Sequence, residues 1–298
     1  MAFRNILQTY AAPDWIRKSL SNIPRYRVQL GNLDTPIHKW NLPDVPEGFE
    51  VYIKRDDMTG STLSGNKVRK LEFLLADAIS RGCCHVITCG AIQSNHCRAT
   101  AIAAAQLGLK THLVLRADLQ STAGVGCQGN VLLDRLCGAA IYVVPNNMCY
   151  KTGLLPRMER IAQHIKQETG EESYLIPVGG SDGVGLYGYL EGFNELLTQG
   201  VPEQFDDIVF ACGSGGTADG LALGNYLTKS KLKIHGVTVS DNRQYFLSQT
   251  AELLTQLRME EVKAADIMDL IDGYKGQGYA LSTPQELGEF YLLSYCRW

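Results

Sequence analysis

Short runs rich in Val, Ile and Leu alternate along the chain with longer segments in which apolar residues recur at helical spacing. After Gly65, for example, Val68, Leu71 and Leu75 follow the i, i+3, i+7 pattern of one helix face. We predict strands over residues 49–54, 84–89, 110–116, 139–144, 174–177, 207–211 and 234–239. We predict helices after Gly65, over 95–107, 129–136, 154–167 and 188–197, from Thr217, and after Pro284.

This alternation of strands and helices predicts the fold class. A helix between two strands of one sheet is a βαβ crossover, which makes the two strands parallel. We therefore expect an α/β protein with mostly parallel sheets and helices on both faces. Because ligands of such folds bind at the carboxyl ends of the strands, the loops that follow the strands are the places to search for chemistry.

The loop after the predicted strand 207–211 is rich in glycine. It opens a helix and consists of Cys212, Gly213, Ser214, Gly215, Gly216 and Thr217. Glycines let several backbone N–H groups converge, and the helix N-terminus adds partial positive charge, so the loop suits a phosphate. It is neither a Walker A motif nor a clean GxGxxG followed by an acidic ribose contact. A tight strand-to-helix turn without a ligand is the alternative.

The loop after the predicted strand 84–89 carries four consecutive polar side chains, Gln93, Ser94, Asn95 and His96. A single Ser or Asn at this position is by default an N-cap. Four polar residues exceed what one cap needs, and converging hydrogen-bonding groups indicate recognition of a small polar ligand. We interpret His96, taken alone, as a helix residue with satisfied hydrogen bonds rather than as a base.

Lys67 stands where a helix is predicted to begin, directly after Ser64, Gly65 and Asn66. Such a lysine is usually a solvated side chain, but its positive charge opposes the helix dipole. The position therefore favours a neutral amine, which a lysine needs in order to form an imine. Together, this lysine, the glycine-rich loop and the polar loop indicate pyridoxal 5′-phosphate (PLP) as the cofactor.

Three segments resemble one family of PLP enzymes. They are KRDDMTGSTLSGNKVRKLEFLLADA, GAIQSNHCRATAIAAAQLGLKTHLVLR and GSGGTADGL, which begin at Lys54, Gly90 and Gly213. In this order and at this spacing they resemble the D-cysteine desulfhydrase/1-aminocyclopropane-1-carboxylate (ACC) deaminase family, over about residues 25–283. SGNKVRKLE together with IQSNH is more diagnostic than any single glycine-rich loop.

The resemblance implies how the chain holds the cofactor. Lys67 corresponds to the imine lysine, and Lys70, one turn further, corresponds to a lysine near the phosphate. Asn95 corresponds to the asparagine that bonds the 3′-oxygen of PLP. The phosphate loop corresponds to Gly213, Ser214, Gly215, Gly216 and Thr217.

The resemblance also implies catalytic and substrate-binding residues. Ser94 corresponds to the active-site serine beside the substrate, and Gln93, Ser94 and Asn95 would orient the substrate carboxylate. Tyr279 lines up with a catalytic tyrosine of the family, although Ala280 replaces the glycine that follows it there.

The family has the two-domain architecture of fold-type II PLP enzymes, related to the β-subunit of tryptophan synthase. By this resemblance, residues 1–68 and 180–298 form a large, discontinuous PLP-binding domain, and residues 69–179 form a smaller inserted α/β domain. PLP is expected in the cleft between the two domains.

The reaction implied by the resemblance is α,β-elimination on D-cysteine. Lys67 would hold PLP as an imine, and its amine, once displaced by the substrate, would take the Cα proton. Loss of the thiolate followed by hydrolysis gives pyruvate, ammonia and hydrogen sulfide. We expect Lys67→Ala to abolish the absorbance of the imine.

The chain departs from the family pattern after Pro284. The family continues there with a strand and a loop of the type DPVYTGKA, which supplies a second active-site tyrosine, and this sequence has no such segment. We therefore expect a shortened large domain with an exposed apolar edge. PLP would still bind through Lys67 and the phosphate loop, but activity would be weak or absent.

Charge and composition exclude other classes of protein. The 28 Lys and Arg residues against 31 Asp and Glu residues give a net charge of −3, and no dense basic run offers a surface for nucleic acid phosphates. No apolar stretch approaches the roughly 18 residues that span a bilayer. We expect a small amino acid as the partner, no nucleic acid or membrane, and a homodimer as in the family.

The cysteines and the N-terminal segment bear on location. Nine cysteines without a CxxC pair argue against a metal site and for reduced thiols inside the cell. The N-terminal segment lacks the compact apolar region of a secretory signal. We expect a cytoplasmic protein. Arg4, Arg17 and Lys18, with no acidic residue before Asp14, make mitochondrial targeting the alternative.

Three functional alternatives stay open on the sequence. An ACC deaminase would release 2-oxobutyrate instead of pyruvate. A catalytically impaired PLP-binding homologue would show the spectrum of bound PLP without turnover. A nicotinamide-dependent oxidoreductase is the weakest alternative, because nothing in the chain resembles its acidic ribose contact.

Overall fold

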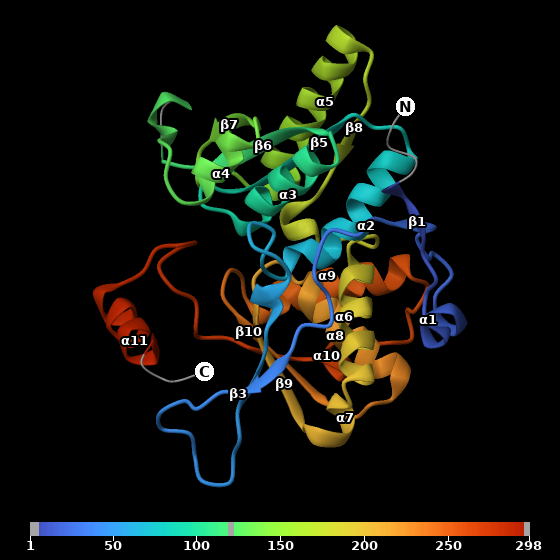
Figure 1. Cartoon of the computed structure of the whole chain (residues 1–298), viewed down its shortest axis with the longest axis vertical. Helices are drawn as coiled ribbons and strands as arrows, with labels where there is room; N and C mark the ends of the chain where they lie inside the picture. The colour runs from blue at the N-terminus through green and yellow to red at the C-terminus, as the bar shows by residue number, and fades with distance from the viewer. Residues whose placement is uncertain (1–5, 119–121, 295–298) are drawn as a thin grey trace.

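The computed structural model describes residues 6–118 and 122–294. Figure 1 shows two bodies of secondary structure, one built around the green strands β5 to β7 and the other around β9 and β10. Helix α2 (Lys67–Ser80) lies where the two bodies meet.

The first body contains a sheet of four parallel strands in the order β7-β6-β5-β8. Its elements are β5 (His85–Ala91), α3 (Asn95–Gln106), β6 (Lys110–Arg116), α4 (Asn130–Leu136), β7 (Ala140–Val144), α5 (Leu155–Thr169) and β8 (Ser173–Leu175). On one face of the sheet, Ile87 and Val114 pack with Met158 of α5. On the other face, Leu113 packs with Cys97 of α3. Helices therefore cover this sheet on both faces.

The second body contains three parallel strands in the order β11-β10-β9. Its elements are α6 (Leu186–Thr198), α7 (Val201–Gln204), β9 (Asp207–Cys212), α8 (Gly216–Thr228), β10 (Lys233–Thr238), α9 (Arg243–Gln256), α10 (Ala264–Ile267) and β11 (Asp269–Ile271). One apolar cluster joins Ile234 and Leu270 of the sheet with Leu221 of α8 and Phe246 of α9. Val209 of β9, which points to the other face, is 67% exposed.

Helix α6 approaches α2 so closely that a glycine is required at the contact. A Cβ atom at Gly188 would come 2.5 Å from the backbone of Arg69 and Lys70. Leu71 and Leu74 of α2 are fully buried in the core on the side of the first body. Helix α2 is therefore fixed between the two bodies, and so are the lysines near its start.

Short elements complete the described chain. They are β1 (Gln8–Thr9) paired with β2 (Tyr26–Arg27), β3 (Ile37–Lys39) paired with β4 (Tyr52–Lys54), α1 (Asp14–Ser19), 3-10 turns at Asp56–Met58, Thr122–Val125 and Val178–Gly180, a π-helical turn at Tyr150–Leu154, and α11 (Pro284–Ser294). Figure 1 shows α11 to one side of the second body. Among the described residues, no helix is long and apolar enough to cross a membrane.

The predicted α/β class with parallel sheets is confirmed. The predicted strand 49–54 is shorter than expected, because only Tyr52–Lys54 pairs and Phe49 is 71% exposed. Helix α9 and strand β11 are among the elements that were not predicted. Strand β11 has only three residues, which is too short for a recognisable alternation. The division into domains at residues 68 and 180 stays a prediction.

Candidate active site

Lys67 is the first residue of α2, as predicted. Gly65 adopts a φ of +102°, which glycine tolerates and which lets the chain turn into the helix. Asn66 Nδ2 donates to Thr217 Oγ1 at 3.2 Å, so the start of α2 is tied to the glycine-rich loop. Burial lowers the pKa of Lys67 to about 8. The amine is thus easier to deprotonate than an ordinary lysine.

Lys70, one turn further along α2, is only 1% exposed. Its Nζ atom donates to the carbonyl of Gly179 at 3.2 Å and to Ser181 Oγ at 3.1 Å. Burial and the nearby Lys67 hold the pKa of Lys70 well below its usual range. Among the described residues, neither amine forms an ion pair with a carboxylate, although the charges of Asp219 and Asp182 partly offset the fall in the pKa of Lys70. Two neighbouring amines without a paired carboxylate indicate a site suited to an anion.

The glycine-rich loop joins β9 to α8 and also contacts Lys70. A Cβ atom at Gly216 would come 2.5 Å from Lys70 Nζ, so the loop backbone lies directly against the amine. The backbone N–H of Gly216 donates to Ser181 Oγ at 3.2 Å, and the Oγ atoms of Ser181 and Ser214 lie 2.9 Å apart. Hydroxyl groups, an N–H group at a helix start and the Lys70 amine therefore converge at one point.

These residues fit PLP. A phosphate dianion would accept hydrogen bonds from the loop and offset the cost of burying the charge of Lys70. Lys67 offers a buried amine with a low pKa for an aldehyde. The backbone at Gly216 leaves no room for a side chain next to Lys70, which is expected where a backbone must approach a ligand closely.

The polar loop at residues 93–95 lies between β5 and α3. Ser94 is the N-cap of α3, and its Oγ atom accepts from the N–H of Cys97 at 3.2 Å, so Ser94 does have the capping role that was considered as the alternative, and its role toward a ligand stays a prediction. The N–H of Asn95 donates to the hydroxyl of Tyr279 at 3.0 Å. The structure thus brings the predicted Tyr279 to the predicted Asn95, across 184 positions of sequence.

Asn130, at the start of α4, also holds the polar loop. Its N–H donates to Gln93 Oε1 at 2.8 Å, and its Nδ2 atom donates to the carbonyl of Gln93 at 2.8 Å and to Asn95 Oδ1 at 2.9 Å. Gln93 Nε2 donates to the carbonyl of Gln128 at 3.3 Å. The side-chain amide of Gln93 is therefore engaged at both ends by this neighbouring loop.

The motifs in the sequence did not indicate two residues near the site, Ser181 and Asn130. Ser181 follows the predicted strand 174–177 in the segment Gly179-Gly180-Ser181, and this second glycine pair at a strand end was the signal that pointed to it. Asn130 follows a glycine with a φ of +57° and gave no local signal. His96 was predicted as a satisfied helix residue, and its Nε2 atom does pair with Thr88 Oγ1 at 2.9 Å.

His96 is nevertheless more than a helix residue. It is 3% exposed, and its Nδ1 atom makes no hydrogen bond with the described residues. Burial, together with Lys67 and Lys70, holds the pKa of His96 well below its usual range. The ring is therefore neutral and adds no further positive charge beside the two lysines.

Two charged residues of the KRDD segment, Lys54 and Asp56, belong to an ion network that holds α2. Arg69 NH1 pairs with Glu195 Oε2 of α6 at 2.8 Å, and Arg69 NH2 pairs with Asp56 Oδ1 at 2.8 Å. Lys54 also pairs with Glu195, and Tyr189 donates to Asp56 Oδ2 at 2.8 Å. This buried network ties β4 and α6 to the first turns of α2, on which both candidate lysines stand.

Fold and site together define the class of protein: an α/β fold in which a lysine with a lowered pKa lies beside a glycine-rich loop at the start of a helix. The chain belongs to the family of pyridoxal-phosphate dependent enzymes, whose family model matches residues 28–287. The family resemblance seen in the sequence motifs is confirmed, and so is the prediction of PLP as the cofactor. The roles of the single site residues stay predictions.

Two relatives agree with the resemblance seen in the motifs. The bifunctional D-cysteine desulfhydrase/1-aminocyclopropane-1-carboxylate deaminase, mitochondrial, of Arabidopsis thaliana is 44% identical over 283 residues, which cover 93% of this chain and 70% of the relative. The D-cysteine desulfhydrase of Klebsiella pneumoniae (strain 342) is 38% identical over 282 residues, which cover 91% of this chain and 81% of the relative.

Solved structures agree with the fold. A crystal structure of an ACC deaminase homologue matches with a TM-score of 0.74 and 37% identity, covering 88% of this chain and 77% of the other. An O-ureido-L-serine synthase matches with a TM-score of 0.59 at 19% identity, over 82% of this chain and 73% of the other. This second match concerns the fold alone.

Proposed function

We propose that this chain is a PLP-dependent lyase that eliminates the thiol group of D-cysteine and releases pyruvate, ammonia and hydrogen sulfide. The observation that carries the proposal is the convergence of Lys67, Lys70 and the backbone of Gly216. D-cysteine as the substrate is supported by the names of the Arabidopsis and Klebsiella relatives.

PLP, when bound, supplies an electron sink that stabilises negative charge at the Cα atom of an amino acid. Lys67 Nζ is the atom that would hold the aldehyde, and Lys70 with the loop at Gly216 would hold the phosphate. Because the pKa of Lys67 is about 8, a useful share of its amine is neutral near neutral pH. The same neutral amine can accept the Cα proton of the substrate.

Ser94 and Asn95 keep groups that can bind the substrate or the cofactor. Ser94 Oγ accepts from Cys97, which leaves the hydroxyl proton free to donate. Asn95 Oδ1 accepts a hydrogen bond from Asn130, so the NH2 group of Asn95 is available to donate to a ligand. We infer that these two residues provide donors for a carboxylate and for the 3′-oxygen of PLP.

Gln93 and Tyr279 are expected to act in different ways. Both ends of the Gln93 amide are engaged by residues 128–130, so we infer that Gln93 shapes the site by holding that loop. The hydroxyl of Tyr279 accepts from the N–H of Asn95 and keeps its own proton for donation. Tyr279 is therefore proposed as a proton donor at the start of α3.

ACC deaminase activity is the second candidate. The Arabidopsis relative is named as bifunctional, and the structure with a TM-score of 0.74 is an ACC deaminase homologue. The two activities differ in their keto acid products, since D-cysteine gives pyruvate whereas ACC gives 2-oxobutyrate. Identification of the keto acid therefore separates them.

The test is to incubate the full chain, loaded with PLP, with D-cysteine, L-cysteine or ACC and to measure sulfide, ammonia and keto acid. We expect sulfide and pyruvate from D-cysteine only, and no visible PLP absorbance in Lys67→Ala. Absence of that absorbance in the wild-type chain after soaking in PLP would overturn the assignment. A normal PLP spectrum without turnover of any substrate would favour the impaired homologue.

We further propose that the chain forms a homodimer and works in a reducing compartment, namely the cytoplasm, with the mitochondrion as the alternative. All eight cysteines among the described residues are free, which agrees with reduced thiols. Light scattering of the purified chain tests the dimer. Imaging of the tagged chain in cells tests the location.

A further inference from the structure

Asn130 sets the orientation of the Asn95 amide, and the hydrogen bonds decide which way it points. The Nδ2 atom of Asn130 lies 2.8 Å from the carbonyl oxygen of Gln93. A backbone carbonyl can only accept, so the NH2 group of Asn130 must face it. The orientation of the Asn130 amide is therefore fixed by the main chain of the polar loop.

The second proton of the same NH2 group is directed at Asn95. Asn130 Nδ2 lies 2.9 Å from Asn95 Oδ1, and because Asn130 can only donate there, Asn95 must present its oxygen. The NH2 group of Asn95 is consequently the end of its amide that is left for a ligand. In the opposite orientation, two NH2 groups would face each other, which is unfavourable.

The segment that carries Asn130 is itself fitted to the polar loop. Gly129 has a φ of +57°, and a Cβ atom there would come 2.5 Å from Gln93 Oε1. The N–H of Asn130 also donates to Gln93 Oε1. On the other side, Tyr279 accepts from the N–H of Asn95. Both the main chain and the side chain of Asn95 are thus held before any ligand binds.

We propose that Asn130 is a positioning residue that locks the Asn95 amide with its NH2 group free to donate to the 3′-oxygen of PLP. This inference rests on the proposed function. That oxygen carries negative charge in bound PLP, so a donor stabilises it and an amide oxygen repels it. Asn130 does not touch the cofactor in this scheme, and it acts only through Asn95.

The main test variant is Asn130→Asp, which keeps the size of the side chain but replaces the NH2 group with a carboxylate oxygen. Asn95 is then expected to rotate and to present its oxygen to the cofactor. Without a donor, the negative charge on the 3′-oxygen is less stabilised, so the proton that it shares with the imine nitrogen is lost at a higher pH. We expect the pH at which the visible absorbance of bound PLP titrates to move upward by about one unit in the variant.

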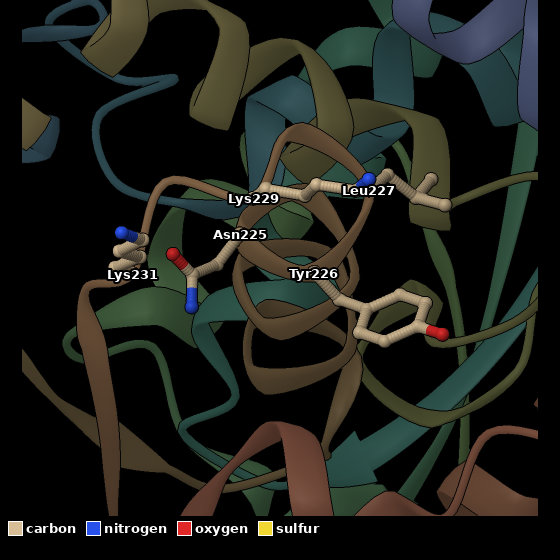
Figure 2. A pocket seen from close by; sticks show the side chains of 5 residues that line it. All are labelled: Asn225, Tyr226, Leu227, Lys229 and Lys231. Carbon is tan, nitrogen blue, oxygen red and sulfur yellow. The ribbon is translucent and has the colours of Figure 1, made fainter.

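Asn225→Asp is the matched control. Asn225 lies in α8, beside a surface hollow that Figure 2 shows, about 14 Å further along the helix than Gly216. Like Asn130, Asn225 binds the main chain of another segment through its side-chain amide. Its Nδ2 atom donates to the carbonyl of Leu232 at 2.8 Å, and its Oδ1 atom accepts from the N–H of Leu232 at 3.0 Å. We expect this variant to melt at a lower temperature while its PLP titration stays that of the wild type.

The outcomes separate the inference from the proposed function. A shift in Asn130→Asp that is absent from Asn225→Asp supports the positioning role. An unchanged titration in a folded, PLP-loaded Asn130→Asp chain, or an equal shift in both variants, overturns it. If Asn130→Asp does not fold, the PLP titration of Asn130→Ala is compared with that of Asn225→Asp instead, and the same two outcomes apply. A wild-type chain that never acquires the visible absorbance contradicts the proposed function instead.

Discussion

The Nζ atom of Lys70 lies directly against the backbone of Gly216, where a Cβ atom would approach it to 2.5 Å. The Lys70 amine and the first turn of α8 are therefore packed without space between them. Lys70 Nζ also donates hydrogen bonds to the carbonyl of Gly179 and to Ser181 Oγ, so the side chain has little freedom to move aside. Any side chain at position 216 must displace either the lysine or the glycine-rich loop.

We expect Gly216→Ala to weaken PLP binding at least tenfold with only a small change in melting temperature. The methyl group would displace the charge that pairs with the phosphate, and a charge-assisted hydrogen bond is worth on the order of 1.5–3 kcal/mol. Fluorescence titration with PLP measures the effect. Gly183→Ala is the control, because its Cβ would meet nothing closer than Gln256 Oε1 at 4.0 Å. Equal affinity of the Gly216→Ala and wild-type chains would contradict the placement of the phosphate.

The rate at which the chain captures PLP is expected to follow the neutral fraction of Lys67. With a pKa of about 8, lowered by burial, about a tenth of this amine is neutral at pH 7. The rate should therefore rise about tenfold per pH unit below pH 8 and level off above it. Growth of the visible absorbance after mixing with PLP at several pH values measures this.

Lys67→Arg provides the baseline for that experiment, because an arginine stays charged and forms no imine. A rate that continues to climb up to pH 10 would indicate a lysine with an ordinary pKa. Such a result would mean that the amine is solvated in the protein, as the alternative interpretation of a lysine at a helix start supposes.

The helix that carries Lys67 and Lys70 could be predicted from the sequence because its signals are local. The apolar spacing of Val68, Leu71 and Leu75 and the preceding Gly65 all lie within a few turns of one another. The glycine-rich loop was predictable for the same reason. In both cases a short stretch of chain determines its own conformation and the chemistry that it can offer.

The partners of these residues come from distant parts of the chain and had no such signal. Ser181 reaches Lys70 across 111 positions, and Tyr279 reaches Asn95 across 184. Which loops meet is decided by the packing of α2 between the two sheets. The charged KRDD segment was grouped with the cofactor motif, yet Asp56 serves an ion network with Arg69, since burial of Arg69 requires paired carboxylates.

We expect this ion network to make the protein sensitive to acid. Burial raises the pKa of Glu195, but the hydrogen bond and charge of Arg69 and the charge of Lys54 outweigh burial and lower it to about 2. Since the pKa is lower in the folded state, the contribution to stability is complete above the ordinary value of 4.5 and is lost as the pH falls toward 2. The free energy of unfolding should therefore decline in that window.

Glu195→Gln tests the origin of the decline. The variant leaves Arg69 with one paired carboxylate fewer, so we expect a loss on the order of 3 kcal/mol at neutral pH and a flatter dependence below pH 4.5. Urea denaturation at several pH values measures both effects. Glu203→Gln, at an exposed position of α7, is the control and should leave the pH dependence unchanged. Parallel curves for Glu195→Gln and the wild type would exclude the network as the source.

Asp134 of α4 is expected to destabilise the protein, so that its replacement by asparagine is stabilising. The residue is 1% exposed, and both of its carboxylate oxygens lack a hydrogen-bond partner among the described residues. Arg98 lowers the pKa of Asp134 only in part, because its guanidinium donates instead to the carbonyls of Thr62 and Ser64. Burial is the larger effect and raises the pKa of Asp134 to about 7.

The sign of this effect is opposite to that at Glu195. Since the folded state holds the proton up to about pH 7 and the unfolded state releases it near 3.8, stability falls as the pH rises through this window and is constant above it. Asp134→Asn removes the charge, so its gain in free energy of unfolding should be smallest at pH 4 and reach on the order of 2–4 kcal/mol above pH 7. Asp206→Asn, at an exposed position, should show no such gain. A gain that is the same at pH 4 and pH 8 would show that the pKa of Asp134 is the same in the folded and the unfolded protein, so that burial does not raise it, and that asparagine merely packs better.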